Sequence, residues 1–488
     1  MNMLQASVHA ASPDAVIAAG ARLGAAVVIY PFLESTNPLC DAAHKIVEAT
    51  LLGPVSAPKQ QLLAEYLVIA AAWHTLEGWR NLAQAALAML NGARPTAVHL
   101  AYYAELRAAR SILANSGICV RDYHHFGLDP SGVVMKFGAR QGRKAPVANP
   151  SIMARIRKGL ALIKGFQRSA GEDITQSERP IRTHVAAAEA LSAWATTAAN
   201  GGRVIGAMRG LRFRGVDWVE AIRSTSMRDS IAAEWLSNWS VDLRSLSRDH
   251  DQRKIASYGV SFNAKDFDPV REDDIRLVRA MNECSLSQDS GDVDALDLAV
   301  LRDFLIKAGR IVAESEGEHL PKRDHSRVWQ RLREYLAGPG GMDMTEADDL
   351  VGSVRKAGKG SGAAVLKAAH TTNRTLPGVL ARAFLLLRLA TSLQLAQWDE
   401  MRLRSAQGKL AWPDEVVRSY AVHTHSAVPS IALNDLRDLE EDQIEAVEEM
   451  GEWLSSNPFD SLATWRDKSV LVQNLCRFER AFLVAAAS

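Results

Sequence analysis

The chain has 488 residues, of which 47% are hydrophobic and 23% are charged. This is the composition of an ordinary globular protein, so it excludes a disordered or fibrous chain. The 57 lysines and arginines nearly balance the 56 aspartates and glutamates, which leaves a formal net charge of +1. Attraction to a polyanion would therefore have to come from a local patch.

The beginning of the chain and the spacing of its cysteines favour a reducing compartment. The N-terminus lacks the basic region of a signal peptide, and Ser12-Pro13-Asp14 is a helix-start signal. The cysteines are far apart and have no metal-binding spacing; they are Cys40, Cys119, Cys284 and Cys476. We expect free core thiols and a cytoplasmic protein.

Apolar residues recur at helical spacing along most of the chain, which predicts an all-α fold class. One helix is predicted around residues 62–79 and another around 103–113, separated by the Asn91-Gly92 stop and the Arg94-Pro95 start. Charged residues interrupt the apolar stretch 379–398, so it predicts a buried core helix rather than a membrane span.

Residues 118–137 depart from the helical pattern. Two β-prone runs, 118–120 and 133–135, flank the turn sequence 129–132, which predicts a small β-hairpin insertion. The length of the chain predicts several domains. We place the boundaries at an N-terminal helical region, the hairpin with a basic segment, a helical block and a C-terminal helical domain: 1–116, 117–170, 171–265 and 266–488.

A run of positive charge follows the predicted hairpin. Between Pro130 and Gly171 no acidic residue occurs, and the basic residues there are Lys136, Arg140, Arg143, Lys144, Arg155, Arg157, Lys158, Lys164 and Arg168. Such a run suits a phosphate backbone, because lysine and arginine release its condensed counterions. It equally suits a solvated face or an acidic protein, and no aromatic residues within it suggest base stacking.

An acidic helix is predicted over residues 435–454, with apolar residues at helical spacing on one face. The candidate partner-binding residues on its charged face are Glu441, Glu445 and Glu448. This face would bind a basic protein, pair with the basic run or simply be solvated.

Metal and cofactor motifs are not convincing. The aspartates between 289 and 297 lack the turn glycine and closing glutamate of a calcium loop. His124 and His125 would point to opposite faces of a strand, so they could not chelate one ion together. We expect no metal and no cofactor.

Three stretches carry a family resemblance: Ala101–Leu113, Arg182–Val185 and Arg253–Tyr258. Together they resemble helical bacterial proteins related to the HEPN superfamily, many of which sit in antiviral defence loci. The resemblance covers about residues 60–260 and implies a HEPN-like helical core. It also implies a metal-free ribonuclease motif, Arg-Asn-x-x-x-His, in which arginine holds the phosphate and histidine transfers the proton.

The third stretch departs from that motif. Arg253 keeps the phosphate-binding residue type, but Lys254 replaces the asparagine and Tyr258 stands where the histidine would be. Tyrosine, with a pKa near 10, is a poor base at neutral pH. Cleavage therefore stays an open question for this stretch.

Other arginine–histidine pairs could take over the proton transfer. The looser pattern occurs at four places, about as often as chance would give: Arg94/His99, Arg179/His184, Arg244/His250 and Arg418/His423. Arg244 and His250 are the best placed, because they lie just before Arg253. The alternatives are a surface position near a helix end for His250 and a helix-start position for His184.

The candidate catalytic residues are therefore Arg253, His250, Arg244 and Tyr258. We expect an RNA-directed effector or RNA-binding component of bacterial antiviral defence, with a metal-independent endoribonuclease as the activity in question. The alternative is a catalytically inactive helical scaffold or regulator that binds a partner protein. No membrane is expected, and many HEPN enzymes dimerise, so a homodimer stays open.

Overall fold

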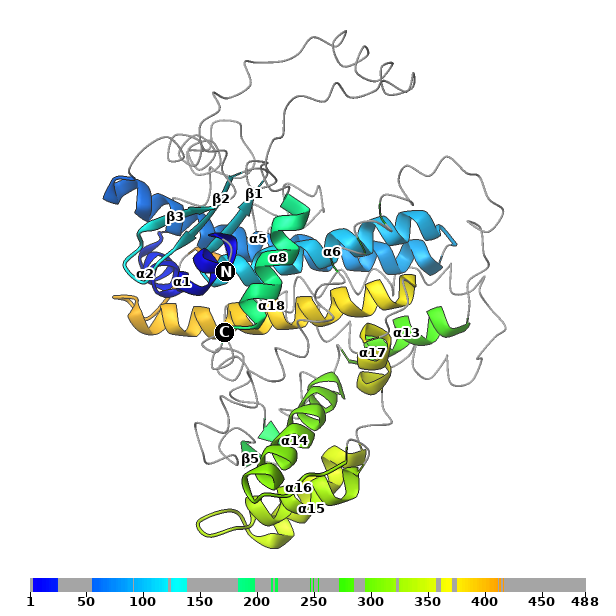
Figure 1. Cartoon of the computed structure of the whole chain (residues 1–488). Helices are drawn as coiled ribbons and strands as arrows, with labels where there is room; N and C mark the ends of the chain where they lie inside the picture. Colours follow the sequence, from blue (N-terminus) through cyan, green and yellow to red (C-terminus); the bar gives the residue numbers. More distant parts are fainter. Residues whose placement is uncertain are drawn as a thin grey trace, which may run out of the picture.

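The computed structural model is mostly helical, with about 77% of the described residues in helices (Figure 1). The residues it describes are 3–24, 55–90, 92–121, 124–137, 183–197, 212–213, 216–217, 246, 249, 253, 272–284, 295–321, 324–356, 361–370, 375–410, 412–413 and 416.

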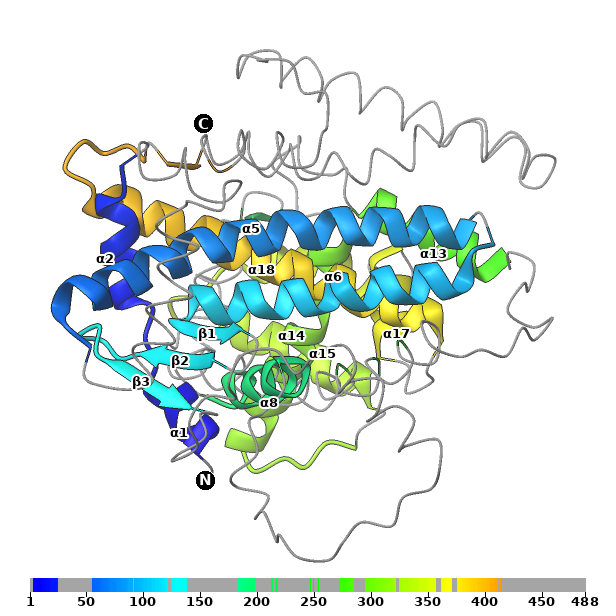
Figure 2. The same ribbon diagram turned by 90° about the horizontal axis from the view of Figure 1, so that it is seen from above.

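Three long helices form the centre of the fold: α5 (Ala57–Leu90), α6 (Arg94–Asn115) and α18 (Leu376–Arg404). They lie side by side in Figure 2, with α6 packed on both others. All three bury most of their length, as helices that are apolar on several sides must. The expected break between α5 and α6 is confirmed, and Gly117, at φ +80°, follows the end of α6.

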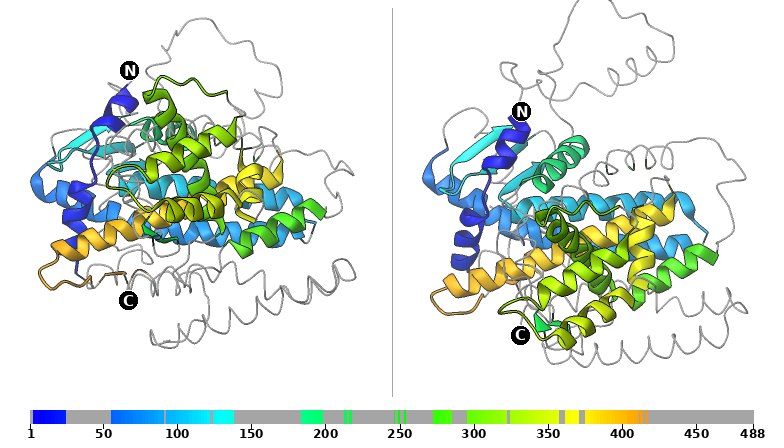
Figure 3. Two further views of the ribbon diagram at one scale, coloured as in Figure 1. Left: turned by 90° about the horizontal axis from the view of Figure 1, so that it is seen from below. Right: turned by 60° about the horizontal axis from the view of Figure 1, so that its bottom comes forward.

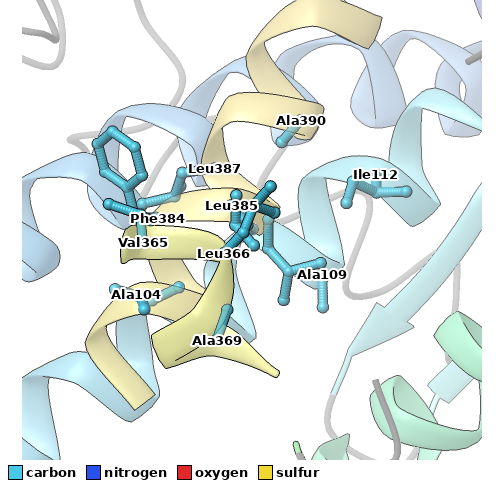
Figure 4. Close-up of a cluster of buried hydrophobic side chains, with 14 of the residues drawn as sticks. Ala104, Ala109, Ile112, Val365, Leu366, Ala369, Phe384, Leu385, Leu387 and Ala390 are labelled. Atoms are coloured by element: carbon cyan, nitrogen blue, oxygen red, sulfur yellow. The ribbon is translucent and has the colours of Figure 1, made fainter. Parts of the chain in front are cut away.

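The interfaces between the long helices combine small residues with large aromatic ones. Ala104 and Ala109 of α6 face leucines and Phe384 of α18 in Figure 4. The Phe384 ring meets Trp79 of α5 edge to face, with ring centroids 5.6 Å apart. The Trp79 indole N–H also donates a 3.0 Å hydrogen bond to the Thr391 hydroxyl of α18.

The expected core helix over residues 379–398 is confirmed by α18. Within the described part of the chain, this helix alone is long and apolar enough to cross a membrane. In its most apolar window, 72% of the residues are buried inside the protein. Its apolar surface is therefore covered by the other helices.

A small antiparallel sheet follows α6 in the order β1 (Ile118–Arg121), β2 (His124–Leu128) and β3 (Val134–Phe137). The expected β-structure is confirmed, but the expected pairing is wrong, because β2 lies between the two β-prone runs. This strand opens with two histidines and contains a glycine, so its sequence has few of the residues that favour strands.

The N-terminal helices close one end of the molecule. Helix α1 (Met3–Ala10) packs on β2, β3 and α8 (Thr183–Ala195), and α2 (Asp14–Arg22) packs on α5 and α18. The Ser12 amide between them donates to the Leu128 carbonyl oxygen at 2.8 Å. The helix start predicted at residues 12–14 is confirmed.

The remaining elements lie on the side of the long helices that faces away from the β1–β3 sheet (Figure 3). They are α13 (Glu272–Glu283), α14 (Ala295–Ser315), α15 (His325–Leu336), α16 (Met344–Lys356), α17 (Ser361–Ala369) and the short strands β4 (Arg212–Phe213) and β5 (Val216–Asp217). Helix α17 packs on both α14 and α18, and thereby joins this group to the long helices.

Candidate functional site

The three stretches that carry the family resemblance meet at one place in the fold. Helix α6 brings His99, Tyr102 and Tyr103, and the first turn of α8 brings His184. Arg253 comes from a helical position much later in the chain. His99, Tyr102 and Tyr103 share one face of α6, because residues three and four apart lie on the same side of a helix. We call these five residues the Arg253 site.

Arg253 is packed against the two tyrosines. Its Nη1 donates a 2.9 Å hydrogen bond to the Tyr103 hydroxyl. Its Cζ lies 5.9 Å from the ring centroid of Tyr102 and 5.7 Å from that of Tyr103, which is the range of cation–π attraction. Only 8% of the residue is exposed, so the guanidinium is a fixed positive charge beneath the surface.

Two half-buried histidines flank this centre. The His99 ring lies 4.8 Å from that of Tyr103, and burial together with the positive charge of Arg253 lowers the pKa of His99. A lowered pKa keeps this imidazole neutral at physiological pH, in the form that accepts a proton. His184 is joined through Nδ1 to the Tyr102 hydroxyl at 2.7 Å, while burial and the nearby Glu105 raise the pKa of Tyr102.

A buried ionic cluster lies next to the Arg253 site. It consists of Glu105 of α6, Asp249 and Arg382 of α18, all of them nearly inaccessible to solvent. Arg382 donates to Asp249 Oδ2 through Nη2 at 2.6 Å and through Nε at 3.1 Å. Its Nε also lies 3.7 Å from Glu105 Oε1. Burial, and then the charge of Asp249, raise the pKa of Glu105 well above its usual range.

The candidate residues chosen from the sequence are only partly placed. Arg253 lies in the site, and Lys136 belongs to β3, where it pairs with Phe126 of β2. The other candidates lie outside the described residues: Arg244, His250, Tyr258, Arg140, Arg143, Lys144, Arg155, Arg157, Lys158, Lys164, Arg168, Glu441, Glu445 and Glu448.

Sequence reasoning missed the residues that surround Arg253. His99 and His184 each belonged to an arginine–histidine pair without special weight, yet both face the same tyrosine pair. Arg94, the sequence partner of His99, instead binds Asp274 of α13 at 3.0 Å. A signal did exist for His99, because it stands on the same helix face as the tyrosines of the first resembling stretch.

Metal chemistry finds no support in the described part of the chain. No group of three or more histidine, cysteine, aspartate or glutamate side chains among these residues could hold a metal ion. Cys119 and Cys284 are buried in the core, as expected. The side chains of the Arg253 site supply imidazole, phenol and guanidinium groups.

Comparison with known proteins adds no relative. No family model matches the chain, and neither a curated protein nor a solved structure is similar to it.

Proposed function

We propose that the protein is an RNA-directed effector whose Arg253 site cleaves an RNA phosphodiester without a metal ion. The observation that carries this proposal is the contact of one buried guanidinium with two tyrosines that are themselves flanked by two histidines. All of these residues except His99 come from the stretches that resemble the HEPN superfamily. That resemblance also supports a HEPN-like core and a role in antiviral defence.

The residues have complementary roles in such a reaction. His99 is the base, because its lowered pKa leaves it neutral and able to take the proton of a ribose 2′-hydroxyl. The 2′-oxygen then attacks phosphorus, and the 5′-oxygen leaves with a proton supplied by His184. The products are a 2′,3′-cyclic phosphate and a 5′-hydroxyl.

Arg253 and Tyr103 act on the phosphate in this scheme. The guanidinium is too deeply buried to clamp the phosphate by itself, but it donates to the half-buried Tyr103 hydroxyl. That hydrogen bond turns the hydroxyl into a better donor to a phosphate oxygen, since hydrogen bonds in a chain polarise one another. The fixed positive charge also favours the negative charge of the transition state.

The test is cleavage of labelled single-stranded RNA in EDTA. We expect His99→Asn to lower the cleavage rate by about 10²–10⁴-fold, the usual contribution of a general base. His319→Asn is the matched control, because His319 is exposed and lies between α14 and α15, and it should leave the rate unchanged. Product ends without a cyclic phosphate, or activity unaffected by His99→Asn, would contradict the proposal.

A native gel with the same samples separates cleavage from binding. RNA that is bound but not cut would support an RNA-binding protein that is not a ribonuclease. RNA neither bound nor cut would favour the scaffold alternative.

A further inference from the structure

The ionic cluster is physically connected to the Arg253 site. Asp249 and Arg253 each occupy a helical position and are four positions apart in the chain, so the place of one limits the place of the other. Leu246, three residues before Asp249, is 1% exposed and packs in the hydrophobic core. Asp249 thus reaches α18 and Arg253 reaches α6, and both residues are buried.

The contacts form a closed ring between three helical elements. Arg253 donates a hydrogen bond to Tyr103 of α6. Asp249, four positions before Arg253, accepts hydrogen bonds from Arg382 of α18. Arg382 then returns to α6 through Glu105, 3.7 Å away. The ring therefore holds the chain at two residues four positions apart, at Asp249 from α18 and at Arg253 from α6.

Arg382 connects this ring to a further helix, α17. Two of its nitrogens converge on the same Asp249 oxygen, and its Nη1 donates to the Ala369 carbonyl oxygen at the end of α17, at 3.3 Å. Hydrogen bonds between ionised groups are shorter and stronger than neutral ones. The guanidinium is thus held from α17 and holds Asp249 in turn.

We propose that Arg382 is a positioning residue for the Arg253 site: by binding Asp249, it holds the segment of Arg253 against the rings of Tyr102 and Tyr103. Its importance for RNA cleavage rests on the proposed function. Its control over the place of Arg253 does not, because that is a property of the fold.

The titration of His99 reports where Arg253 lies, and NMR of histidine-labelled protein measures it. The charge of Arg253 lowers the pKa of His99, so withdrawal of Arg253 raises it towards the ordinary value of 6.5. The variant is Asp249→Asn, which keeps the size of the side chain and weakens its bond to Arg382. His99→Asn identifies the resonance.

The sign of the result separates positioning from a direct effect of charge. Removal of the negative Asp249 acts directly on His99 only by lowering its pKa, because it disfavours the imidazolium. Displacement of Arg253 raises it. We expect a rise in Asp249→Asn, and no further rise when the same change is made in an Arg253→Gln background. An unchanged or lowered pKa in Asp249→Asn overturns the proposal.

A second variant covers the case in which Asp249→Asn does not fold. Arg382→Lys keeps the positive charge of the cluster but cannot reproduce the paired contacts of the guanidinium. We expect it to raise the His99 pKa in the same direction, and an unchanged value would again overturn the proposal. Asp348→Asn is the matched control, because Asp348 pairs with Arg333 at the surface and should leave His99 unaffected.

The two proposals fail in different ways. If RNA is not cleaved by the unmodified protein but the His99 titration moves as expected, the positioning role stands and the ribonuclease does not. If RNA is cleaved through His99 but the titration does not respond to Asp249 or Arg382, the reverse holds.

Discussion

The raised pKa of a glutamate in the core makes a sharp prediction about stability and pH. Glu105 is 1% exposed, and its Oε1 lies 3.7 Å from Nε of Arg382, which also binds Asp249. Burial and the charge of Asp249 raise its pKa above the ordinary 4.5, and the positive charge of Arg382 offsets only part of that rise. The informative change is Glu105→Gln, because glutamine has nearly the shape of a protonated glutamate and never ionises.

The sign follows from the protons that each state binds. Above pH 4.5 the unfolded chain releases the Glu105 proton while the folded protein keeps it, so stability falls as pH rises towards the folded pKa. The contribution is complete below the unfolded pKa. One retained proton changes the free energy of unfolding by at most roughly 1–1.5 kcal/mol for each pH unit between the unfolded and the folded pKa.

Urea unfolding followed by far-UV circular dichroism measures this dependence. We expect the Glu105→Gln variant to gain stability relative to the unmodified protein as the pH rises, by up to the amount above. Glu314→Gln is the control, because Glu314 is exposed on α14 and should change nothing. If the unmodified protein and Glu105→Gln show the same dependence on pH, Glu105 is ionised in the fold and the reasoning is refuted.

Two further predictions concern backbone and buried hydroxyl contacts. A left-handed backbone conformation costs a residue with a side chain about 1–2 kcal/mol, and Gly117→Ala should cost more than this, because its Cβ would also meet the Ser12 carbonyl oxygen. Gly92 is left-handed too but has open space around it, so Gly92→Ala should cost less. The difference between the urea midpoints of the two variants measures the effect of the contact. Thr75→Val should lower the free energy of unfolding by about 1–3 kcal/mol, because it breaks the buried 2.7 Å hydrogen bond to Ser111. The double variant with Ser111→Ala should lose less stability than the two single variants lose together, which a double-mutant cycle measures.

The helices could be predicted from the sequence because their causes are local. Apolar periodicity identifies α5, α6 and α18, and the pairs Asn91-Gly92 and Arg94-Pro95 mark the end of α5 and the beginning of α6. Strand β2 could not be predicted in this way, since its place depends on the neighbours with which it pairs. Strand propensity reflects packing against such neighbours more than the backbone itself.

The candidate site could be predicted only in part, for the same physical reason. Arg253 attracted attention through its residue type and its resemblance to a known motif. Arg382, in contrast, was visible only as a charge that interrupts an apolar stretch. Its partner Asp249 is 133 positions away, and nothing in the local sequence of either residue identifies the other. A charged residue on an otherwise buried helix face is nevertheless a general signal that a partner exists.

The packing of α18 on α5 has a consequence for the newly made chain. The Trp79 indole and its Thr391 partner are 312 positions apart. At translation rates of about 5–20 residues per second, the ribosome needs about 15–60 s to pass from one to the other. During that time α5 and α6 are complete but lack the helix that covers them. The N-terminal part of the nascent chain therefore has to be shielded, by chaperones or by transient contacts of its own, until α18 emerges.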